Sequence, residues 1–307
     1  MISVIIISNN NINDLKRCIN NVIMQSFKNI EIIIIDKYLN KEISTYINNL
    51  KIDINIKYID IDNNIFKDSY LKNVGIDNSN GDYICFINNL SEFSLDKFET
   101  MINIFNKNKK VDIILSNINL YINYDNGNIV KKYESNLTQD NYKKEILLNP
   151  IYFNFANPIV KRKILINNNY FDQNLETLDD YEILIKLLFK YNVYIIEDIL
   201  TEIDLDKNYF NNINISDYKT EYEYITYQYK SLFEKIENKK LKEYNYLNII
   251  ENISLIKRNK YNFKNSLKKK LKIKFNIYDL LLLLVSFLNM KRLSKIKLIF
   301  DVKRFKL

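Results

Sequence analysis

The chain has 307 residues, of which 47% are hydrophobic, and its formal net charge is +8. This length and composition predict one large globular domain, or one domain with an extension. The sequence contains no histidine, which excludes a Ser-His-Asp triad, a Cys-His pair and a His-ligated zinc site. Acid–base chemistry must therefore use Asp, Glu, Lys or Tyr.

Rare residue types carry more information here than common ones. Isoleucine, asparagine, lysine and tyrosine dominate, as is typical of an AT-rich genome, and glycine occurs only 3 times. We therefore expect Gly75, Gly81 and Gly127 to occupy positions where a side chain is costly. The two cysteines, Cys18 and Cys85, lie among apolar residues and are expected to pack in the core. Such sparse cysteine use is typical of a reducing cytoplasm.

The first part of the chain alternates short apolar runs with amphipathic segments. Met1 leads directly into the apolar run Ile2–Ile7, which predicts a buried strand and not a signal peptide. The next apolar residues, from Leu15 to Ile23, form one stripe of a helix that Asn13 or Asp14 would cap. Further strands are predicted at 31–35, 54–59, 83–87 and 111–115, and further helices at 41–50, 66–78 and 96–107.

This alternation predicts a parallel sheet with helices on both faces. Ligands of such sheets bind beyond the carboxyl ends of the strands. The polar segments that follow three predicted strands are therefore the first candidates for a site, at residues 8–10, 36–37 and 88–92.

The pattern changes after residue 115. Ile118, Leu120 and Ile122 share one face, and the Asp-Asn-Gly sequence at 125–127 predicts a hairpin turn. A helix is predicted at 179–190 and strands at 193–196 and 199–203, and the chain reads as helical from about residue 217. We therefore place one domain at 1–215 and a basic helical region at 216–307.

Three patterns occur in order along the first two-thirds of the chain. The first runs from the opening strand through Gln25-Ser26-Phe27 to Asp36, and the second joins Lys72-Asn73-Val74-Gly75 to Gly81. The third comprises residues 158–162, 171–175 and 179–182. Together they resemble the catalytic domain of family 2 glycosyltransferases. The open alternative is another doubly wound nucleotide-binding domain.

The resemblance implies an α/β fold of the GT-A type, which is a Rossmann-like mixed sheet flanked by helices. The pattern of the remaining residues adds an all-helical C-terminal extension to this domain. The resemblance also implies transfer of a sugar from a nucleotide-diphosphate donor to a glycan or lipid-linked acceptor, with inversion. Asn9, Asp36, Lys72, Asn73 and Asn88 match positions near the donor. Lys72 stands where the family has an Arg near the phosphates, and Asn73 is expected to brace the loop. For Asp36, a solvated strand-end cap is the structural alternative.

The metal motif of the family is where this chain departs from it. The family holds a divalent cation, Mg²⁺ or Mn²⁺, with Asp-x-Asp at the end of the fourth strand, and this chain has Asn88-Asn89-Leu90 there. Asn88 offers a carbonyl oxygen, Leu90 offers no ligand, and Glu92 lies two residues too late. We therefore expect a weakened metal site and assign no metal ligand.

The acids implied for the acceptor side are Asp179 and Asp180. Asp180 matches the position of the catalytic base, and Asp179 replaces a Glu. The structural alternative is that both simply cap the start of a helix, where Asp is favoured. The departure at Asn88 leaves a second hypothesis open, a catalytically inactive relative that binds or scaffolds within a glycan-assembly system.

Basic residues are concentrated at the C-terminal end. Residues 239–307 contain 19 Lys and Arg against 4 Asp and Glu, a net charge of +15, while the rest of the chain carries −7. The apolar core at 277–290 is too short to span a bilayer. Residues 261–307 are typical of a segment that binds an anionic membrane surface, which would place a cytoplasmic protein on the inner face of the membrane. A helix packed on the domain with solvated lysines, and a generic membrane-surface adaptor, remain alternatives. Nucleic-acid binding is not expected.

Overall fold

The computed structural model describes residues 1–61, 67–123, 130–149, 155–205, 207–235 and 239–286, with residues 290, 293 and 297. The chain forms two compact units. The first unit comprises residues 1–119, 134–143 and 153–203, and the second comprises 120–133, 144–152 and 204–307.

Four parallel strands begin the sheet of the first unit. They are β1 (Ile2–Ser8), β2 (Ile30–Asp36), β3 (Asn55–Asp60) and β4 (Tyr83–Ile87), in the order β3-β2-β1-β4. Their short isoleucine-rich sequences suit strands that are covered on both faces. The predicted parallel arrangement is confirmed. Because Ser8 is opposite Asp36 in the register, the segments that follow β1 and β2 leave the sheet at the same edge.

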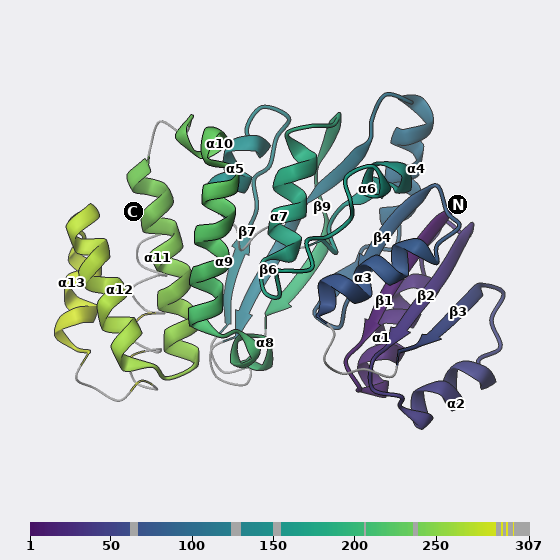
Figure 1. Ribbon diagram of the computed structural model, residues 1–307, viewed down its shortest axis with the longest axis horizontal. Helices are drawn as coiled ribbons and strands as arrows, with labels where there is room; N and C mark the ends of the chain where they lie inside the picture. Colours follow the sequence, from purple (N-terminus) through teal and green to yellow (C-terminus); the bar gives the residue numbers. More distant parts are fainter. Residues whose placement is uncertain are drawn as a thin grey trace. The chain divides into compact units, whose positions relative to one another are not determined.

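Helices cover both faces of these strands (Figure 1). They are α1 (Ile12–Ile23), α2 (Lys41–Asn49), α3 (Asp68–Asp77) and α4 (Lys97–Lys107). One buried cluster joins Val4 and Ile6 of β1 to Leu15 of α1 and Phe98 of α4. Ile5, which points to the other face, lies against α3.

The N-cap of α1 is Asn11, and the prediction of Asn13 or Asp14 was wrong by two or three residues. The Asn11 side chain accepts hydrogen bonds from the backbone N–H groups of Asn13 and Asp14 at 3.0 and 3.4 Å. Leu15, which opens the buried stripe, is correctly placed on α1. In a chain this rich in asparagine, several neighbouring residues have capping chemistry, and the cap is decided by where the strand turn ends.

Two of the three glycines occupy positions that exclude a side chain. A Cβ on Gly75 would lie 2.5 Å from Ile5 Cγ2. A Cβ on Gly81 would lie 2.7 Å from the backbone nitrogen of Ser3 and 2.9 Å from the carbonyl oxygen of Met1. These close approaches let α3 and the turn before β4 pack directly on β1, as expected. Gly127 and the predicted turn at 125–127 lie outside the described residues.

The remaining strands make the sheet mixed, and nine strands belong to it within the described residues. They are β5 (Ser91–Phe93), β6 (Ile113–Asn123), β7 (Val130–Glu134), β8 (Ile159–Lys161) and β9 (Val193–Leu205). β8 is antiparallel to both β4 and β6, and β5 is antiparallel to β9. The expected mixed sheet is thus present. The two strands predicted at 193–203 are one continuous strand, because exposed residues Glu197 and Asp198 do not interrupt it.

Three helices occur between β7 and β9 in the sequence. They are α5 (Tyr142–Leu148), α6 (Arg162–Ile166) and α7 (Asp179–Leu188). α7 begins at the residue where the sequence predicted a helix, and residues 183, 184, 187 and 188 are buried as expected. The short strands β5 and β8 and the helices α5 and α6 were not predicted.

The second unit is helical from residue 207 onward in the residues described. Its helices are α8 (Lys207–Asn212), α9 (Ile215–Gln228), α10 (Lys230–Glu234), α11 (Lys239–Ile256), α12 (Lys260–Ile273) and α13 (Ile277–Leu284). α11, α12 and α13 lie side by side (Figure 1). None of the helices in the described part of the chain combines the length and apolarity needed to cross a bilayer.

Buried charges occupy the interior of this helical group. Lys270 Nζ lies 2.6 Å from Glu251 Oε2 and 2.9 Å from Asp279 Oδ1, and Lys297 Nζ bonds the other oxygen of Glu251. Tyr244 donates its hydroxyl to Asp279 at 2.7 Å. Part of the basic segment is therefore structural, because Lys270 and Lys297 are buried against carboxylates. By contrast, residues 268, 269, 272 and 274 are exposed lysines.

Candidate active site

A cation and two acids meet where α3 faces the start of α7. Lys72 Nζ lies 2.7 Å from Asp179 Oδ2 and 2.6 Å from Asp180 Oδ1. The second oxygen of Asp180 accepts the backbone N–H of Phe155 at 3.1 Å. Three predicted site residues, separated by 107 and 108 positions in sequence, are thus brought into one cluster.

This geometry differs from that of a simple helix cap. Leu178 is the N-cap residue of α7 and makes no side-chain capping bond. The carboxylates of Asp179 and Asp180 bond Lys72 and Phe155, which are remote in sequence. The negative charge at a helix N-terminus is still favoured by the helix dipole. The two acids therefore have both a local stabilising influence and a tertiary partner.

Aromatic rings form the wall beside this cluster. The rings of Phe86, Phe155 and Phe171 meet edge to face, with centroids 5.0 to 5.6 Å apart. Lys72 Nζ lies 5.0 Å from the centroid of the Phe171 ring. Such a wall excludes water, so charges next to it interact strongly.

Burial controls the protonation of these groups. Burial raises the pKa of Asp179 to about 7, outweighing the Lys72 ammonium, which acts to lower it. Burial also acts to lower the pKa of Lys72, but Asp179 and Asp180 outweigh it and raise that pKa above its ordinary value. Two carboxylates share one ammonium, so the cluster is short of one positive charge and takes up a proton readily. Asp180 is the more accessible acid, with 20% of its side chain exposed against 5% for Asp179.

Asn73 holds the same two segments together. Its Nδ2 donates to the carbonyl oxygen of Phe171, and its Oδ1 accepts the N–H of Phe171, both at 3.0 Å. Lys67 and Ser69 at the start of α3 donate to the carbonyl oxygens of Asn174 and Leu175. Because α3 and residues 171–175 are tied at three points, the position of Lys72 relative to α7 is fixed.

Asp36 lies at the end of β2 with its side chain fully buried. Its carboxylate accepts the N–H groups of Tyr38 and Asn40 at 3.0 and 3.2 Å and the Tyr58 hydroxyl at 2.8 Å. These bonds fix the loop after β2, and the Asn40 side chain then caps α2. A direct contact of Asp36 with a nucleotide stays a prediction, and in this geometry it requires the loop to open.

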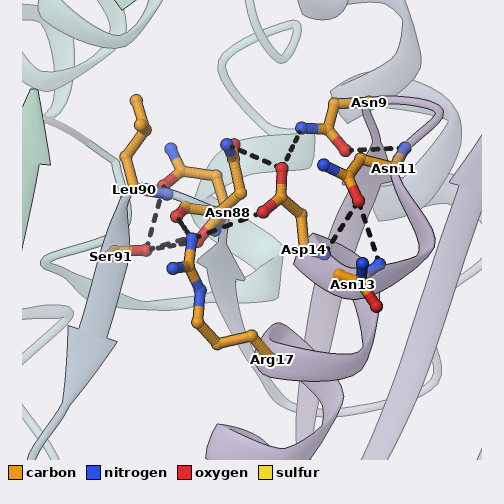
Figure 2. Close-up of polar contacts among 9 residues, drawn as sticks. Asn9, Asn11, Asn13, Asp14, Arg17, Asn88, Leu90 and Ser91 are labelled. Carbon is orange, nitrogen blue, oxygen red and sulfur yellow. Dashed lines mark hydrogen bonds and ion pairs between the residues drawn. The ribbon is translucent and has the colours of Figure 1, made fainter. Parts of the chain in front are cut away.

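The turn after β4 is closed by hydrogen bonds between Asn88, Leu90 and Ser91 (Figure 2). Asn88 Oδ1 accepts the N–H of Leu90 at 3.1 Å and the hydroxyl of Ser91 at 3.0 Å. The Asn88 N–H in turn donates to Ser91 Oγ at 3.2 Å. The side-chain oxygen that the sequence offered as a ligand is therefore already bonded within the turn.

Two residues of α1, Asp14 and Arg17, join this turn to the end of β1 (Figure 2). Asp14 Oδ2 accepts Asn9 Nδ2 at 2.7 Å and Asn89 Nδ2 at 3.3 Å. Arg17 Nη2 donates to the carbonyl oxygen of Asn89 and lies 3.6 Å from Asp14 Oδ1. Asp14 was expected only as a possible helix cap and Arg17 was not expected at the site, although their spacing of three on one helix was the available signal.

The donor set of this turn does not fit a divalent cation. Mg²⁺ and Mn²⁺ bind oxygen ligands that include carboxylates. Asp14 is the carboxylate bonded to this turn, and it accepts two amide N–H groups beside a guanidinium. Glu92 lies on β5, where it is paired with Glu202 of β9 and is directed away from buried Ser91 and Phe93. Among the described residues, no group of three or more Asp, Glu, Cys or His side chains could hold a metal ion.

Comparison with known proteins identifies the family. The model of glycosyl transferase family 2 matches residues 3–167, which is more than half of the chain. The chain belongs to glycosyl transferase family 2. An uncharacterised glycosyltransferase of Rickettsia conorii is 29% identical to it over 204 residues, which cover 66% of this chain. The chain spans about a third of that relative's length, since the match covers 32% of it.

Solved structures share the fold of this family 2 member. S. aureus TarS 1-349 in complex with UDP-GlcNAc has a TM-score of 0.56 and 12% identity, and the match covers 89% of this chain and 88% of that one. The mannosyltransferase PcManGT from Pyrobaculum calidifontis, in complex with GDP-Man and Mn²⁺, has a TM-score of 0.52 and 10% identity. That match covers 98% of this chain and 87% of PcManGT. At such identities the likeness establishes the GT-A fold alone.

Proposed function

We propose that this glycosyltransferase moves a sugar from a nucleotide-diphosphate donor to a hydroxyl of a glycan or lipid-linked acceptor, with inversion. The observation that supports the proposal most directly is the Lys72–Asp179–Asp180 cluster beside the aromatic wall. Family membership supplies the reaction class, and the cluster supplies a carboxylate with partial access to solvent.

In this mechanism Asp180 is the general base. The acceptor oxygen attacks the anomeric carbon, its proton passes to the Asp180 carboxylate, and the bond from the anomeric carbon to the pyrophosphate oxygen breaks. The nucleoside diphosphate leaves with the bonding electron pair. Lys72 and the Phe155 N–H hold the carboxylate in position, since each bonds a different oxygen of Asp180. Attack from the face opposite the leaving group inverts the anomeric centre.

The second candidate is a nucleotide-binding subunit that does not catalyse transfer. Two observations favour it, the absence of a carboxylate in the Asn88–Leu90 turn and the commitment of Lys72 to two acids. Isothermal titration with UDP, GDP, UDP-GlcNAc and GDP-mannose, with MnCl₂ or with EDTA, separates the candidates when a donor-hydrolysis assay is run in parallel. Binding with turnover supports the transferase, binding without turnover supports the subunit, and no binding to any nucleotide contradicts both.

We also propose that the region 216–307 attaches the protein to the inner, anionic face of a membrane. On α13, Ile277, Leu281 and Leu284 fall at offsets 0, 4 and 7, so they share one helix face. Their exposed fractions are 58%, 38% and 60%, and Phe275 just before the helix is 70% exposed. Exposed lysines on α12 and at residue 274 supply positive charge next to this apolar face.

Replacing Phe275 and Leu284 by Asp is expected to lower binding to phosphatidylserine vesicles at least about tenfold, because two apolar side chains no longer enter the interface. Co-sedimentation measures the bound fraction. The matched control is Leu95→Asp, which changes an apolar residue of the first unit that is 56% exposed. Equal binding of the double variant and the control, or equal binding to phosphatidylcholine vesicles, contradicts membrane attachment through α13.

A further inference from the structure

The proposed donor carries two charged phosphates, and the Asn88–Leu90 turn does not fit a metal ion that could balance their charge. A nucleoside diphosphate that leaves with two charged phosphates needs a nearby cation. In the described residues this turn carries neither a carboxylate nor a free Asn88 side-chain oxygen. The amide nitrogens of Asn9 and Asn89 both donate to Asp14, so two N–H groups already bond one oxygen of the carboxylate beside the turn.

Two cationic side chains, Lys72 and Arg17, are candidates to balance this charge, and their surroundings differ. Lys72 is bonded to two carboxylates, and its side chain is only 14% exposed. Its charge is therefore already paired with the two acids on the acceptor side. Arg17 has 63% of its side chain exposed and lies 3.6 Å from one carboxylate, that of Asp14. Its guanidinium reaches the carboxyl end of β4, where it donates to the carbonyl oxygen of Asn89.

We propose that Arg17 binds the pyrophosphate of the donor in place of a divalent cation, so that this chain binds nucleoside diphosphates without metal. This inference rests on the proposed function. The guanidinium is planar, permanently charged and able to form two parallel hydrogen bonds to a phosphate. A single N–H group of Arg17 is used by Asn89, which leaves donors for a ligand on the exposed side chain.

The contacts of Arg17 with Asn89 and Asp14 position its guanidinium group beside the turn. The bond to Asn89 fixes the guanidinium against the turn, so less side-chain freedom is lost when a phosphate binds. Asp14, three residues earlier on α1, keeps Arg17 at the turn. The Asp14 carboxylate also accepts two amide N–H groups, which stabilise its charge when Arg17 turns towards a phosphate. Asp14 is thus a positioning residue and not a metal ligand.

Isothermal titration of the full chain tests the inference with UDP, UMP, GDP and GMP in EDTA and again in MnCl₂. We expect the diphosphate that binds best to keep its affinity in EDTA within about twofold. Arg17→Gln is expected to weaken diphosphate binding about 10- to 100-fold, because a charge-assisted pair is lost, and to change monophosphate binding less. The matched control is Lys16→Gln, which removes the same charge from the neighbouring residue, whose ammonium lies over the ring of Tyr46.

The outcomes separate this inference from the proposed function. If neither the wild type nor any variant binds a nucleotide, the proposed function fails. If the wild type binds only with Mn²⁺, and Arg17→Gln binds as the wild type does, the function stands and the role of Arg17 is wrong. Asp14→Asn adds a second readout. A positioning role predicts that its diphosphate binding stays independent of Mn²⁺, whereas a metal-ligand role predicts that Mn²⁺ increases wild-type affinity and no longer does so in Asp14→Asn.

Discussion

Asp180→Asn is expected to lower kcat for sugar transfer by about 10²- to 10⁴-fold, the range by which a positioned general base accelerates a reaction. The amide keeps the size of the side chain and its one oxygen can still accept from Lys72, although the N–H of Phe155 then loses its acceptor. The amide cannot take the proton of the acceptor hydroxyl. Affinity for the nucleotide, measured by titration, should change by less than about twofold.

The pH dependence of the reaction gives the same prediction a second readout. Because burial raises the pKa of Asp179 to about 7, Asp179 takes up a proton as the pH falls through 7. Below that pH Asp179 is neutral and the cluster is less negative, so it accepts the proton of the acceptor hydroxyl less readily. We therefore expect kcat/KM to fall as the pH drops below 7 and to level off above it. Asp179→Asn should move this acid limb to lower pH, because the group with the raised pKa is removed.

A matched control separates chemistry from folding in this experiment. Asp82→Asn makes the same change at the amino end of β4, where the side chain is 79% exposed and bonds the N-terminal amine. It should leave kcat and the pH profile unaltered. An Asp180→Asn enzyme with more than a tenth of wild-type kcat would show that another group accepts the proton.

The parallel part of the fold was predictable from sequence because each element carries a local signal. The isoleucine runs of β1 and β2 are short, continuous and buried, and the residues of α1 follow a helical period. The later strands lack such signals. β8 has three residues, and its place between β4 and β6 is decided by long-range pairing of Ile159 and Val160. Local pattern cannot specify a pairing of this kind.

The candidate site was predictable as a set of residues but not as a set of contacts. Resemblance placed Lys72 by the phosphates and the acids by the acceptor, yet Lys72 bonds both Asp179 and Asp180 across more than a hundred residues. A buried acid next to a half-buried one needs a cation, and this requirement becomes visible only when α3 and α7 are placed together. The contacts of Arg17 and Asp14 with the turn after β4 were missed because a charged pair on an amphipathic helix is usually just part of its solvated face.

The second large effect concerns the interior of the helical unit. Glu251→Gln is expected to lower the free energy of unfolding by about 3–5 kcal/mol at pH 7, the cost of breaking a buried ion pair. The side chain of Glu251 is fully buried, and each of its oxygens bonds a different lysine, Lys270 or Lys297. Glutamine matches the shape but leaves both ammonium groups without their shared carboxylate. Urea denaturation of the full chain, followed by circular dichroism, measures the difference.

The matched control is Glu234→Gln on α10, where an exposed glutamate lies 3.7 Å from Lys230 with 54% of its side chain in solvent. Because water screens that pair, the expected change is below about 1 kcal/mol. If both variants lose the same stability, the pairing of Glu251 with the two lysines is not a source of stability.

Measuring the loss of unfolding free energy at two pH values shows whether Glu251 acts through its charge. Burial acts to raise the pKa of Glu251, but Lys270 and Lys297 outweigh it and lower the pKa to about 2 from an ordinary value of 4.5. A carboxylate whose pKa is lowered by folding contributes stability that is present above 4.5 and is lost as the pH falls towards 2. This contribution is about 3 kcal/mol at pH 7 and about 2 kcal/mol at pH 3.5. The gap between wild type and Glu251→Gln should therefore shrink by about 1 kcal/mol over that range, because a protonated Glu and a Gln have the same charge. A gap that stays constant would mean that Glu251 acts through packing and not through its charge.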